Sequence, residues 1–486
     1  MLRPDRYPFF DKLLFGVFVL LLPVIMASAP KVFDDGDVSW HIAAGRWILA
    51  HRAVPATDPF SFTFGGHPWV AFEWLSEVIY AAAFNLAGYP GVAAVVALAI
   101  MALHFIIFVY LRRRVGPVAI LLSFLIMDAV LAKFILARPH VLVWPLLAGW
   151  TAALLNCRDR RMPPRLPLAL LMFVWANLHG SFILGFAIAA AIGVDALIAV
   201  EFDKRAIKGW LLFALASTAG AMLNANGLAG FLHPLTVIGM TNLNYIQEWQ
   251  PSTPSFTPLF YLALLGLLGA LMLRGVRFKA GELVLLLLML GMAFSQVRHQ
   301  SWLAIIAPLL IAPRLARNDR ELAAPLFSSG RDRFAWISSA VGGAVILLAA
   351  RLALPLQPTE GRGNPRSLLA NIPDALRRAP VLNEYSFGGP LILAGIRPYI
   401  DGRSDMYGDA FVTDYTRIAD GDMDRFNGAV RKYGIQWTML PPNLPLTKAL
   451  DASSLWHRVY ADRVGVIHVR RGELRQDSDG GPKERR

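Results

Sequence analysis

Long apolar segments recur over the first 354 residues and limit what this chain can fold into. Each is close to the length that a helix needs to cross about 30 Å of hydrocarbon, once tilt and helix ends are allowed for. The chain is 56% hydrophobic, which is too apolar for an ordinary soluble protein. We therefore expect a polytopic, all-α membrane bundle of about eleven spanning helices. The segments lie at roughly 13–29, 89–111, 116–136, 140–156, 166–177, 182–200, 209–224, 257–273, 281–296, 300–313 and 335–354.

Basic residues gather in alternate loops between these segments. One set of loops holds most of them, whereas the other set holds only Lys31, Arg46, Arg52, Lys133, Arg138 and Arg298. By the positive-inside rule the basic loops are cytoplasmic, which places the N-terminus inside and the chain after about residue 355 outside. The net charge of +13 is then a signal of topology, and we expect no nucleic-acid partner. A secretory signal cleaved near Ala29 is an alternative interpretation of the first segment, and it leaves the later loops on the same side.

The segment from Asp34 to Glu77 is the one stretch where carboxylates, histidines and tryptophans crowd together directly after an apolar segment. If Asp34 opens a helix, Asp37 and His41 lie one turn apart on one face, and the apolar side of that helix suits a membrane boundary. Asp is also favoured as a helix cap, but three acids exceed what a cap needs. We therefore interpret Asp34, Asp35 and Asp37 as candidate catalytic residues.

Other unusual polar residues fall in loops that we place on the same outer side. Polar groups at a membrane boundary are costly, and a bundle that served only as an anchor would not need them. Alternatively, the arginines extend toward lipid headgroups, and the histidines satisfy nearby carboxylates. The additional candidates are His41, Glu73, Arg138, His140, His179, Glu248, Arg298 and His299.

The composition changes at about residue 355, where short β-type runs begin to alternate with helical ones. We expect a small extracytoplasmic α/β domain at 355–475 and a polar disordered tail at 476–486. The membrane domain would then be 1–354, with its first outer loop at 30–88. In the run YIDGRSDMY, we interpret Asp401 and Arg403 as a salt bridge at a strand end, with acceptor binding as the alternative.

The chain contains no P-loop, no dinucleotide fingerprint and no HExxH or paired CxxC. Nucleotide-driven pumping, redox chemistry and zinc hydrolysis therefore lack their usual sequence motifs. Transfer from a membrane-bound phosphate donor requires a carboxylate that deprotonates the attacking hydroxyl and cations that stabilise the departing phosphate. The three first-loop acids meet the first requirement, and Arg138, Arg298 and His299 meet the second. Asp35 and Asp37 could instead hold a divalent metal such as Mg or Mn on their oxygens.

The layout of the chain resembles the GT-C class of integral membrane glycosyltransferases: a first span, an outer loop that opens with Asp-Asp, many further spans and a C-terminal outer domain. The motif DGDVSWHIAAGRWILAHRAVPATDPFSFTFGGHPWVAFEWLSE is also similar to a group of bacterial multispan proteins related to that class. Members related to protein O-mannosyltransferases and lipid A aminoarabinose transferases use a polyprenyl-phosphate sugar and a first-loop Asp as general base. The resemblance implies that Asp35 is the base, with Asp34 and Asp37 beside it.

The implied activity is transfer of a sugar from a polyprenyl-phosphate donor to a glycan, lipid or protein acceptor at the outer face of a bacterial inner (plasma) membrane. A single base opposite the leaving phosphate implies inversion at the anomeric carbon. Two other classes stay open, namely a transporter or lipid flippase whose pathway the polar residues would line, and a non-catalytic scaffold with a binding outer domain. The apparent confinement of polar residues to one face favours the enzyme over the transporter.

Overall fold

The computed structural model describes residues 8–241, 247–316 and 330–471, and the chain divides into two compact units. We call the first the helical unit, formed by Met1–Val32, Phe72–Ile238 and Leu243–Leu356. The second, the mixed unit, is formed by Phe33–Ala71, Gly239–Asn242 and Gln357–Arg486. The sequence assigned 30–88 to the membrane domain, whereas residues 33–71 pack with the chain that follows residue 357. The tail predicted at 476–486 lies outside the described residues.

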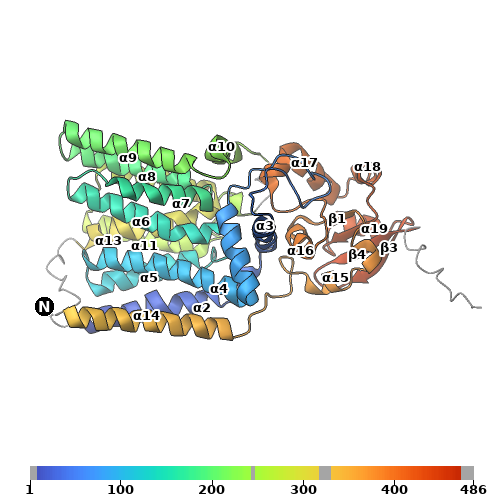
Figure 1. Cartoon of the computed structure of the whole chain (residues 1–486), viewed down its shortest axis with the longest axis horizontal. Coiled ribbons are helices and arrows are strands. Elements are labelled where there is room, and N and C mark those ends of the chain that lie inside the picture. The colour runs from blue at the N-terminus through green and yellow to red at the C-terminus, as the bar shows by residue number, and fades with distance from the viewer. Residues whose placement is uncertain (1–7, 242–246, 317–329, 472–486) are drawn as a thin grey trace, which may run out of the picture. The chain divides into compact units, whose positions relative to one another are not determined.

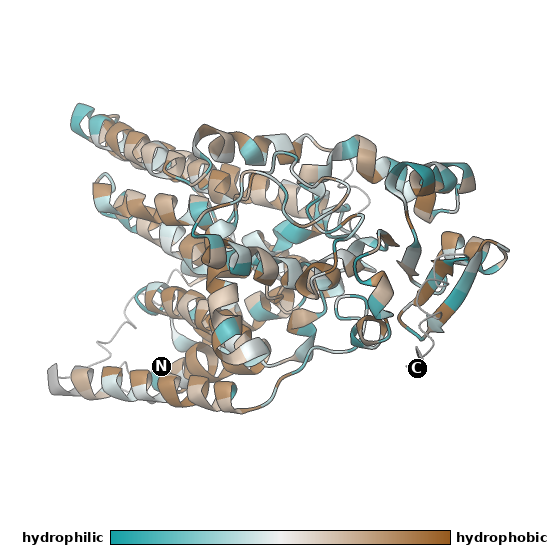
Figure 2. Cartoon of the chain, turned by 45° about the vertical axis from the view of Figure 1, so that its right-hand side comes forward, coloured by the Kyte–Doolittle hydropathy of each residue, from teal (hydrophilic) through white to brown (hydrophobic). Residues whose placement is uncertain are grey.

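Apolar helices that pack side by side make up the described part of the helical unit (Figure 1). Its α-helices are α1 (Pro8–Leu14), α2 (Leu22–Ala27), α4 (Trp74–Arg112), α5 (Pro117–Leu131), α6 (Pro139–Asp159), α7 (Leu170–Leu178), α8 (Phe182–Ile198), α9 (Lys204–Met222), α10 (Gly227–Ile238), α11 (Pro258–Arg274), α12 (Ala280–Ser295), α13 (Gln300–Leu315) and α14 (Gly330–Ala353). Shorter helical turns are the π-helix η2 (Phe15–Leu21) and the 3-10 helices η4 (Leu166–Ala169), η6 (Gln247–Trp249) and η7 (Val297–His299). Hydrophobic residues colour these helices brown in Figure 2, as expected for segments that face lipid or each other.

The predicted count of eleven membrane spans is not confirmed, although every predicted apolar segment is at least largely helical. Among the described residues, four helices are long and apolar enough to cross a membrane, namely Phe10–Ala27, Trp74–Arg112, Pro139–Asp159 and Phe334–Ala353. A fifth is reached if α9 and α10, which meet at 96°, form one broken span. The others are shorter: the 15 residues of α5 rise roughly 22 Å, against about 30 Å of hydrocarbon.

Two breaks shape the helical unit, and each has a local cause. In α4 the backbone leaves the helical region at Ala87 and Gly88, and Gly88 has a φ of 61° that favours glycine. The corner between α9 and α10 is held by Asn224, whose amide donates to the carbonyls of Ala221 and Gly227. Asn224 therefore acts as a turn residue, which was the preferred interpretation of its position in the sequence.

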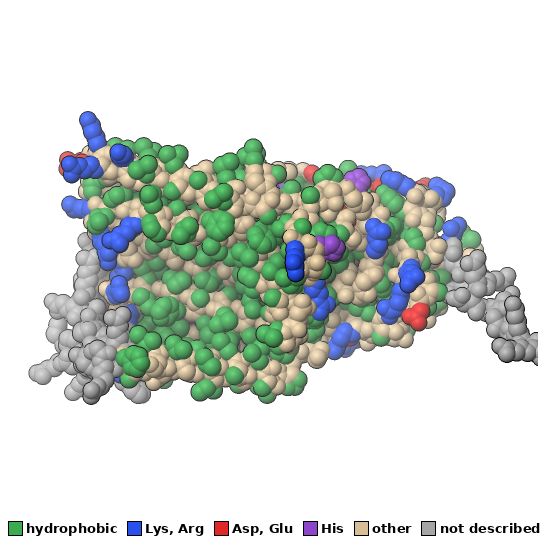
Figure 3. All heavy atoms as spheres, viewed as in Figure 1, with side chains coloured by type: hydrophobic (Ala, Val, Ile, Leu, Met, Phe, Trp, Pro, Cys, Tyr) green, Lys and Arg blue, Asp and Glu red, His purple; other side chains and the backbone are tan. Residues whose placement is uncertain are grey.

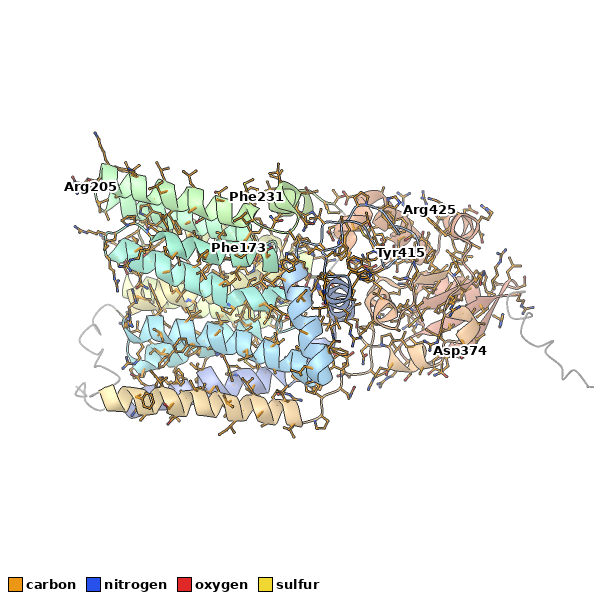
Figure 4. All side chains as sticks on the ribbon, in the orientation of Figure 1. Phe173, Arg205, Phe231, Asp374, Tyr415 and Arg425 are labelled. Atoms are coloured by element: carbon orange, nitrogen blue, oxygen red, sulfur yellow. The ribbon has the colours of Figure 1, made fainter. Side chains whose placement is uncertain are left out.

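Charged side chains are concentrated at one end of the helical unit. Figure 3 shows Lys and Arg gathered there on an otherwise hydrophobic surface, and Figure 4 shows Arg205 extending from the start of α9. Inside this end, Arg158 donates to Glu282 at 2.6 Å and Arg314 donates to the same carboxylate at 2.8 Å. Glu282 is 1% exposed, so the pairing satisfies a charge that would otherwise be costly to bury. These residues belong to the loops predicted to be cytoplasmic or lie next to them.

A four-stranded sheet with helices around it forms the mixed unit, which confirms the predicted small C-terminal α/β fold. The strands are β1 (Val381–Asn383), β2 (Trp437–Leu440), β3 (Trp456–Ala461) and β4 (Val466–Arg470), in the order β1-β2-β4-β3. Strand β1 is parallel to β2, and the crossover that such a pair requires contains helices. The helices are α3 (Asp37–His51), α15 (Arg366–Ala370), α16 (Gly388–Leu393), α17 (Ser404–Ala419), α18 (Met423–Tyr433) and α19 (Pro445–Asp451).

Strands β1, β2 and β4 are buried on both faces, whereas β3 is partly exposed. Successive residues of a strand point to opposite faces, so neighbours in β1 belong to different apolar clusters. Val381 packs with Trp437 in one apolar cluster, and its neighbour Leu382 packs with Ile400 and Tyr415 in another. Figure 4 shows Tyr415 on α17 within this unit, where its hydroxyl accepts the backbone N–H of residue 385 at 2.9 Å. The strands are therefore a rigid base for the loops that surround α3.

Candidate functional site

The acidic segment Asp34–Asp37, which we call the acid turn, leads directly into α3 in the mixed unit. The helix begins at Asp37, three residues later than the start considered from the sequence. The Asp35 side chain is bound into this start, because its Oδ1 accepts the backbone N–H of Asp37 at 2.9 Å. Asp34 is exposed, whereas Asp35 and Asp37 are half-buried. The N-cap residue is Gly36, and Asp35, the residue that the family resemblance marks as the base, closes a local turn around it.

Helix α3 is partly buried in the mixed unit. Ile42 and Ile48, which were expected to face the bilayer boundary, are 0% and 6% exposed. His41 follows Asp37 by one helical turn as predicted, but it is buried, with its ring 3.7 Å from that of Trp40. Trp47 is half-buried and Leu49 is 43% exposed, so an interfacial position of this helix stays a prediction that only its exposed side could satisfy.

An ion pair buried in the mixed unit joins the first loop to the C-terminal part. Arg403 donates to Asp401 through Nε at 2.8 Å and Nη2 at 2.6 Å, and to Asp58 through Nη1 at 2.6 Å. Its guanidinium also lies 5.2 Å from the Phe60 ring and 4.8 Å from the Trp69 ring. Burial alone would lower the pKa of Arg403, but the two carboxylates, Asp401 above all, raise it well above its ordinary value. The predicted pairing of Asp401 with Arg403 is confirmed, although it lies directly before α17 and not at a strand end. Asp58 is a partner that the sequence analysis missed.

The helical unit contains a second group, the arginine cluster, made of Arg138, Glu248 and Arg298. Arg138 precedes the proline that opens α6, and its Nη1 donates to both oxygens of Glu248 at 3.2 Å. Arg298 in η7 places Nη1 3.8 Å from Glu248 Oε1, and its guanidinium lies 4.3 Å above the Trp249 ring. The three side chains are 19%, 27% and 21% exposed in that order, so the cluster is open to a ligand. Three predicted residues from separate loops are therefore brought together.

The two arginines of the arginine cluster keep its carboxylate ionised. Burial alone would raise the pKa of Glu248, but Arg138 and then Arg298 lower it to about 2, so the carboxylate is ionised at physiological pH. Arginine forks match phosphate oxygens in geometry and charge, so this group can bind an anion of that kind.

His179 and His299 are held in neutral forms. His179 accepts the Ser181 backbone N–H at Nδ1 (2.9 Å) and directs Nε2 toward Glu73 Oε1 at 3.3 Å. Burial, followed by the charge of Arg298, holds the pKa of His179 well below its ordinary value. Burial likewise lowers the pKa of His299 to about 3. His299 therefore adds no positive charge for a phosphate at neutral pH, and the cations of the proposed donor site are the two arginines.

Local hydrogen bonds hold His140 and the residue that follows Glu73. His140, in the first turn of α6, donates from Nε2 to the carbonyl of Phe134 at 2.8 Å. Trp74, next to Glu73, donates its indole N–H to Asn177 Oδ1 at 2.8 Å. The bond from Trp74 joins the start of α4 to the end of α7, beside the Glu73 and His179 pair.

The sequence analysis missed one buried pair within the helices. His104 on α4 lies 3.0 Å from Asp128 Oδ1 on α5, and its Nδ1 donates to the carbonyl of Phe18 at 2.6 Å. Phe18 belongs to the π-helix η2, and such wide turns leave carbonyls available for other donors. Both residues lie inside apolar segments of the sequence, where an ionisable residue is itself a signal of a structural or functional role.

No metal centre is evident in residues 8–241, 247–316 and 330–471, where no group of three or more His, Cys, Asp or Glu side chains could hold an ion. Asp35 and Asp37 are adjacent, but Asp35 Oδ1 is engaged with the Asp37 N–H. The divalent ion considered for Asp35 and Asp37 is therefore not confirmed, and we derive no step through one.

No protein-family model matches the chain, and no curated protein sequence matches it. Among solved structures, ArnT from Cupriavidus metallidurans in the apo state is similar at 14% identity and a TM-score of 0.52, over 93% of this chain and 97% of that chain. Two structures of the Archaeoglobus fulgidus oligosaccharyltransferase, one tethered with an acceptor peptide containing the NVT sequon and one in complex with Zn and sulfate, each have 12% identity and a TM-score of 0.49. They cover 88% and 87% of this chain, and 69% and 68% of their own. The likeness to ArnT shows that this chain has the GT-C fold, which confirms the resemblance inferred from its layout.

Proposed function

We propose that this chain, which has the GT-C fold, is a membrane glycosyltransferase that moves a sugar from a polyprenyl-phosphate donor to an acceptor hydroxyl. The observation that carries the proposal is the arginine cluster. Arg138 and Arg298 share one ionised carboxylate, and the side chains are partly exposed. The leaving group of the reaction is a phosphate, whose growing negative charge such a pair of arginines can stabilise.

The reaction follows from the roles of three residues. Asp35 takes the proton of the acceptor hydroxyl, and the hydroxyl oxygen forms a bond to the anomeric carbon of the sugar. The bond between that carbon and the phosphate oxygen breaks, and polyprenyl phosphate leaves with the electron pair, its charge offset by Arg138 and Arg298. Attack from the side opposite the leaving phosphate inverts the anomeric centre. The Asp37 N–H on Asp35 Oδ1 orients the base for this step.

Glu248 has a defined part in this scheme. With no donor bound, its carboxylate neutralises one positive charge and keeps the two arginines close together. The donor phosphate would take its place, because both present oxygen acceptors of the same charge sign to the same guanidinium groups. Binding of donor is thus an exchange of one anion for another, and the cost of separating Glu248 from Arg138 weakens donor affinity.

The proposed setting is the outer face of a bacterial inner membrane, with a glycan, lipid or protein as acceptor. The alternation of basic and neutral loops supports this orientation. The apolar helices of the helical unit support a membrane location, and the mixed unit would then lie outside the membrane beside the acceptor.

A transporter or flippase is the second candidate, and one observation favours it. The pair formed by His104 and Asp128 is buried within the helices, and ionisable pairs at such depth often carry protons in transporters. Under that reading the arginine cluster would bind a transported anion. A third possibility is a non-catalytic scaffold, in which neither the arginine cluster nor the pair of His104 and Asp128 takes part in a reaction.

The test is transfer of labelled sugar from a polyprenyl-phosphate donor pool in membranes that contain native protein or Asp35→Asn, each with and without a chelator. The control is Asp374→Asn, a fully exposed acid. Loss of transfer in Asp35→Asn, with native folding and a normal control, supports the enzyme and its base. Equal product from Asp35→Asn and native protein removes Asp35 from the mechanism. Product from neither contradicts the proposed donor and favours the transporter or scaffold. The chelator arm decides whether Mg or Mn takes part.

A further inference from the structure

The acid turn lies against a glycine from the far end of the chain, within the mixed unit. Gly402 has no side chain, and a Cβ at this position would overlap with Asp37 Oδ1. The same Cβ would lie 2.8 Å from the indole nitrogen of Trp40. Both contacts are closer than real Cβ atoms show, so the space beside Gly402 is filled by the Asp37 carboxylate and the Trp40 ring.

The backbone at Gly402 has little freedom to withdraw from this contact. Its carbonyl accepts the hydroxyl of Tyr385 at 3.0 Å. Its neighbours Asp401 and Arg403 are 0% and 1% exposed and are bonded to each other through the buried ion pair described above. Asp401 also accepts the hydroxyl of Tyr407 at 2.7 Å. An added methyl group at 402 would therefore have to move Asp37 rather than the glycine.

A second close approach lies at the other end of the acid turn. A Cβ at Gly363 would overlap with the backbone carbonyl of Asp34. The acid turn is thus bounded by backbone from two segments that follow the helical unit in sequence, at 363 and at 402. A first loop that folded independently would have no such contacts.

From these contacts we infer that Gly402 is a positioning residue, which sets the direction of the Asp37 carboxylate and, through the Asp37 N–H on Asp35 Oδ1, the orientation of Asp35. The C-terminal part of the chain is then a component of the acid turn and not an appendage that only binds acceptor. The contact itself rests on geometry alone, whereas its effect on catalysis rests on the proposed function.

The experiment is a double-mutant cycle between Gly402→Ala and Asp37→Ala in the full-length protein, with thermal unfolding in detergent as the first readout. In the native background Gly402→Ala should lower the Tm on the order of 3 °C, because overpacking a tight site is destabilising. In the Asp37→Ala background most of that loss should vanish, since the overlapping carboxylate is gone. Equal losses in both backgrounds would overturn the inference.

The second readout is sugar transfer per folded molecule, and Gly428→Ala is the matched control. Gly428 lies in α18 of the same unit with no atom within 4 Å of an added Cβ. Its substitution should leave transfer unchanged and should not lower the Tm, since alanine is favoured over glycine inside a helix. Gly402→Ala should lower transfer at least about tenfold, because misplacing a catalytic group is costly. If Gly402→Ala and Asp37→Ala are coupled in Tm but Gly402→Ala leaves transfer unchanged, the contact between the two residues stands. That result would contradict the catalytic role proposed for the acid turn.

Discussion

Arg403 Nη1 donates to Asp58 Oδ1 at 2.6 Å, although the two residues are 345 positions apart in the chain. Both side chains are almost fully buried, and the guanidinium is held on its other edge by Asp401. This bond attaches the first loop to the C-terminal α/β fold. A loop that follows the first apolar segment in sequence is therefore a structural part of the mixed unit.

Loss of this ion pair should unfold the mixed unit at lower denaturant concentration. Asp58→Ala removes the acceptor of Arg403 Nη1, while Asp401 still balances the charge of the guanidinium. The Phe60 N–H and the Ser61 hydroxyl also lose their acceptor. A lost buried hydrogen bond to a charged group costs about 1.5 to 3 kcal/mol. Denaturant unfolding followed by tryptophan fluorescence would measure the change. Asp374→Ala is the control, because Asp374 pairs with Arg377 on the surface, where Figure 4 labels it, and no measurable change is expected. A cost for Asp58→Ala no larger than that of the control would refute the role of the pair.

The arginine cluster should be essential for sugar transfer. Arg138→Ala and Arg298→Ala should each lower kcat about 10²- to 10³-fold, as expected for loss of a group that stabilises the leaving anion. The lysine variants should recover part of the activity, since they keep the charge but lose the planar fork. Arg417→Ala, at a position on α17 of the mixed unit, is the control and should transfer at the native rate. Native rates in both alanine variants would remove the cluster from the mechanism.

Glu248→Gln should strengthen donor binding. The neutral amide no longer competes with the donor phosphate for Arg138 and Arg298, so we expect the KM for the donor to fall several-fold. Initial rates over a range of donor concentrations would measure this. An increase in KM would mean that Glu248 holds the arginines in their binding geometry and is not exchanged for the phosphate.

Acid should destabilise the helical unit through His299. Burial lowers its pKa to about 3 in the folded state, below the ordinary value of 6.5. The stability that neutral His299 contributes is therefore fully present above pH 6.5. As pH falls from 6.5 toward 3, the unfolded chain takes up a proton that the folded chain refuses, and stability decreases by up to about 1.4 kcal/mol per pH unit. Glu248, with its pKa lowered to about 2, adds a further loss between about pH 4.5 and 2.

Unfolding measured at pH 8, 6, 5 and 4 tests this dependence on His299. The variant His299→Gln should show a flatter decline below pH 6.5 than native protein, whereas His67→Gln, at an exposed position, should keep the native slope. Identical slopes for native protein and His299→Gln would show that other groups cause the acid sensitivity.

Local patterns in the sequence predicted the features that depend on near neighbours. The apolar segments predicted helices, and the shift in composition near residue 355 predicted the α/β fold that the sheet β1-β2-β4-β3 confirms. Asn224 and the salt bridge between Asp401 and Arg403 were also anticipated, because turn chemistry and short-range pairing are visible within a few residues. Helix length was less well predicted, since the ends of an apolar run need not be helical, as in α5.

The grouping of residues across the chain was decided only by tertiary structure. Nothing near Asp58 in sequence indicates Arg403 as its partner, and nothing near Asp37 indicates that Gly402 must lack a side chain. The sequence by itself determined that this is a helical, membrane-type chain with an α/β C-terminal part and polar loops on the proposed outer side. Which loop packs with which unit, and which carboxylate meets which arginine, depends on contacts between segments hundreds of residues apart. Such contacts leave no periodic pattern, because their energy arises only when burial removes the paired groups from water.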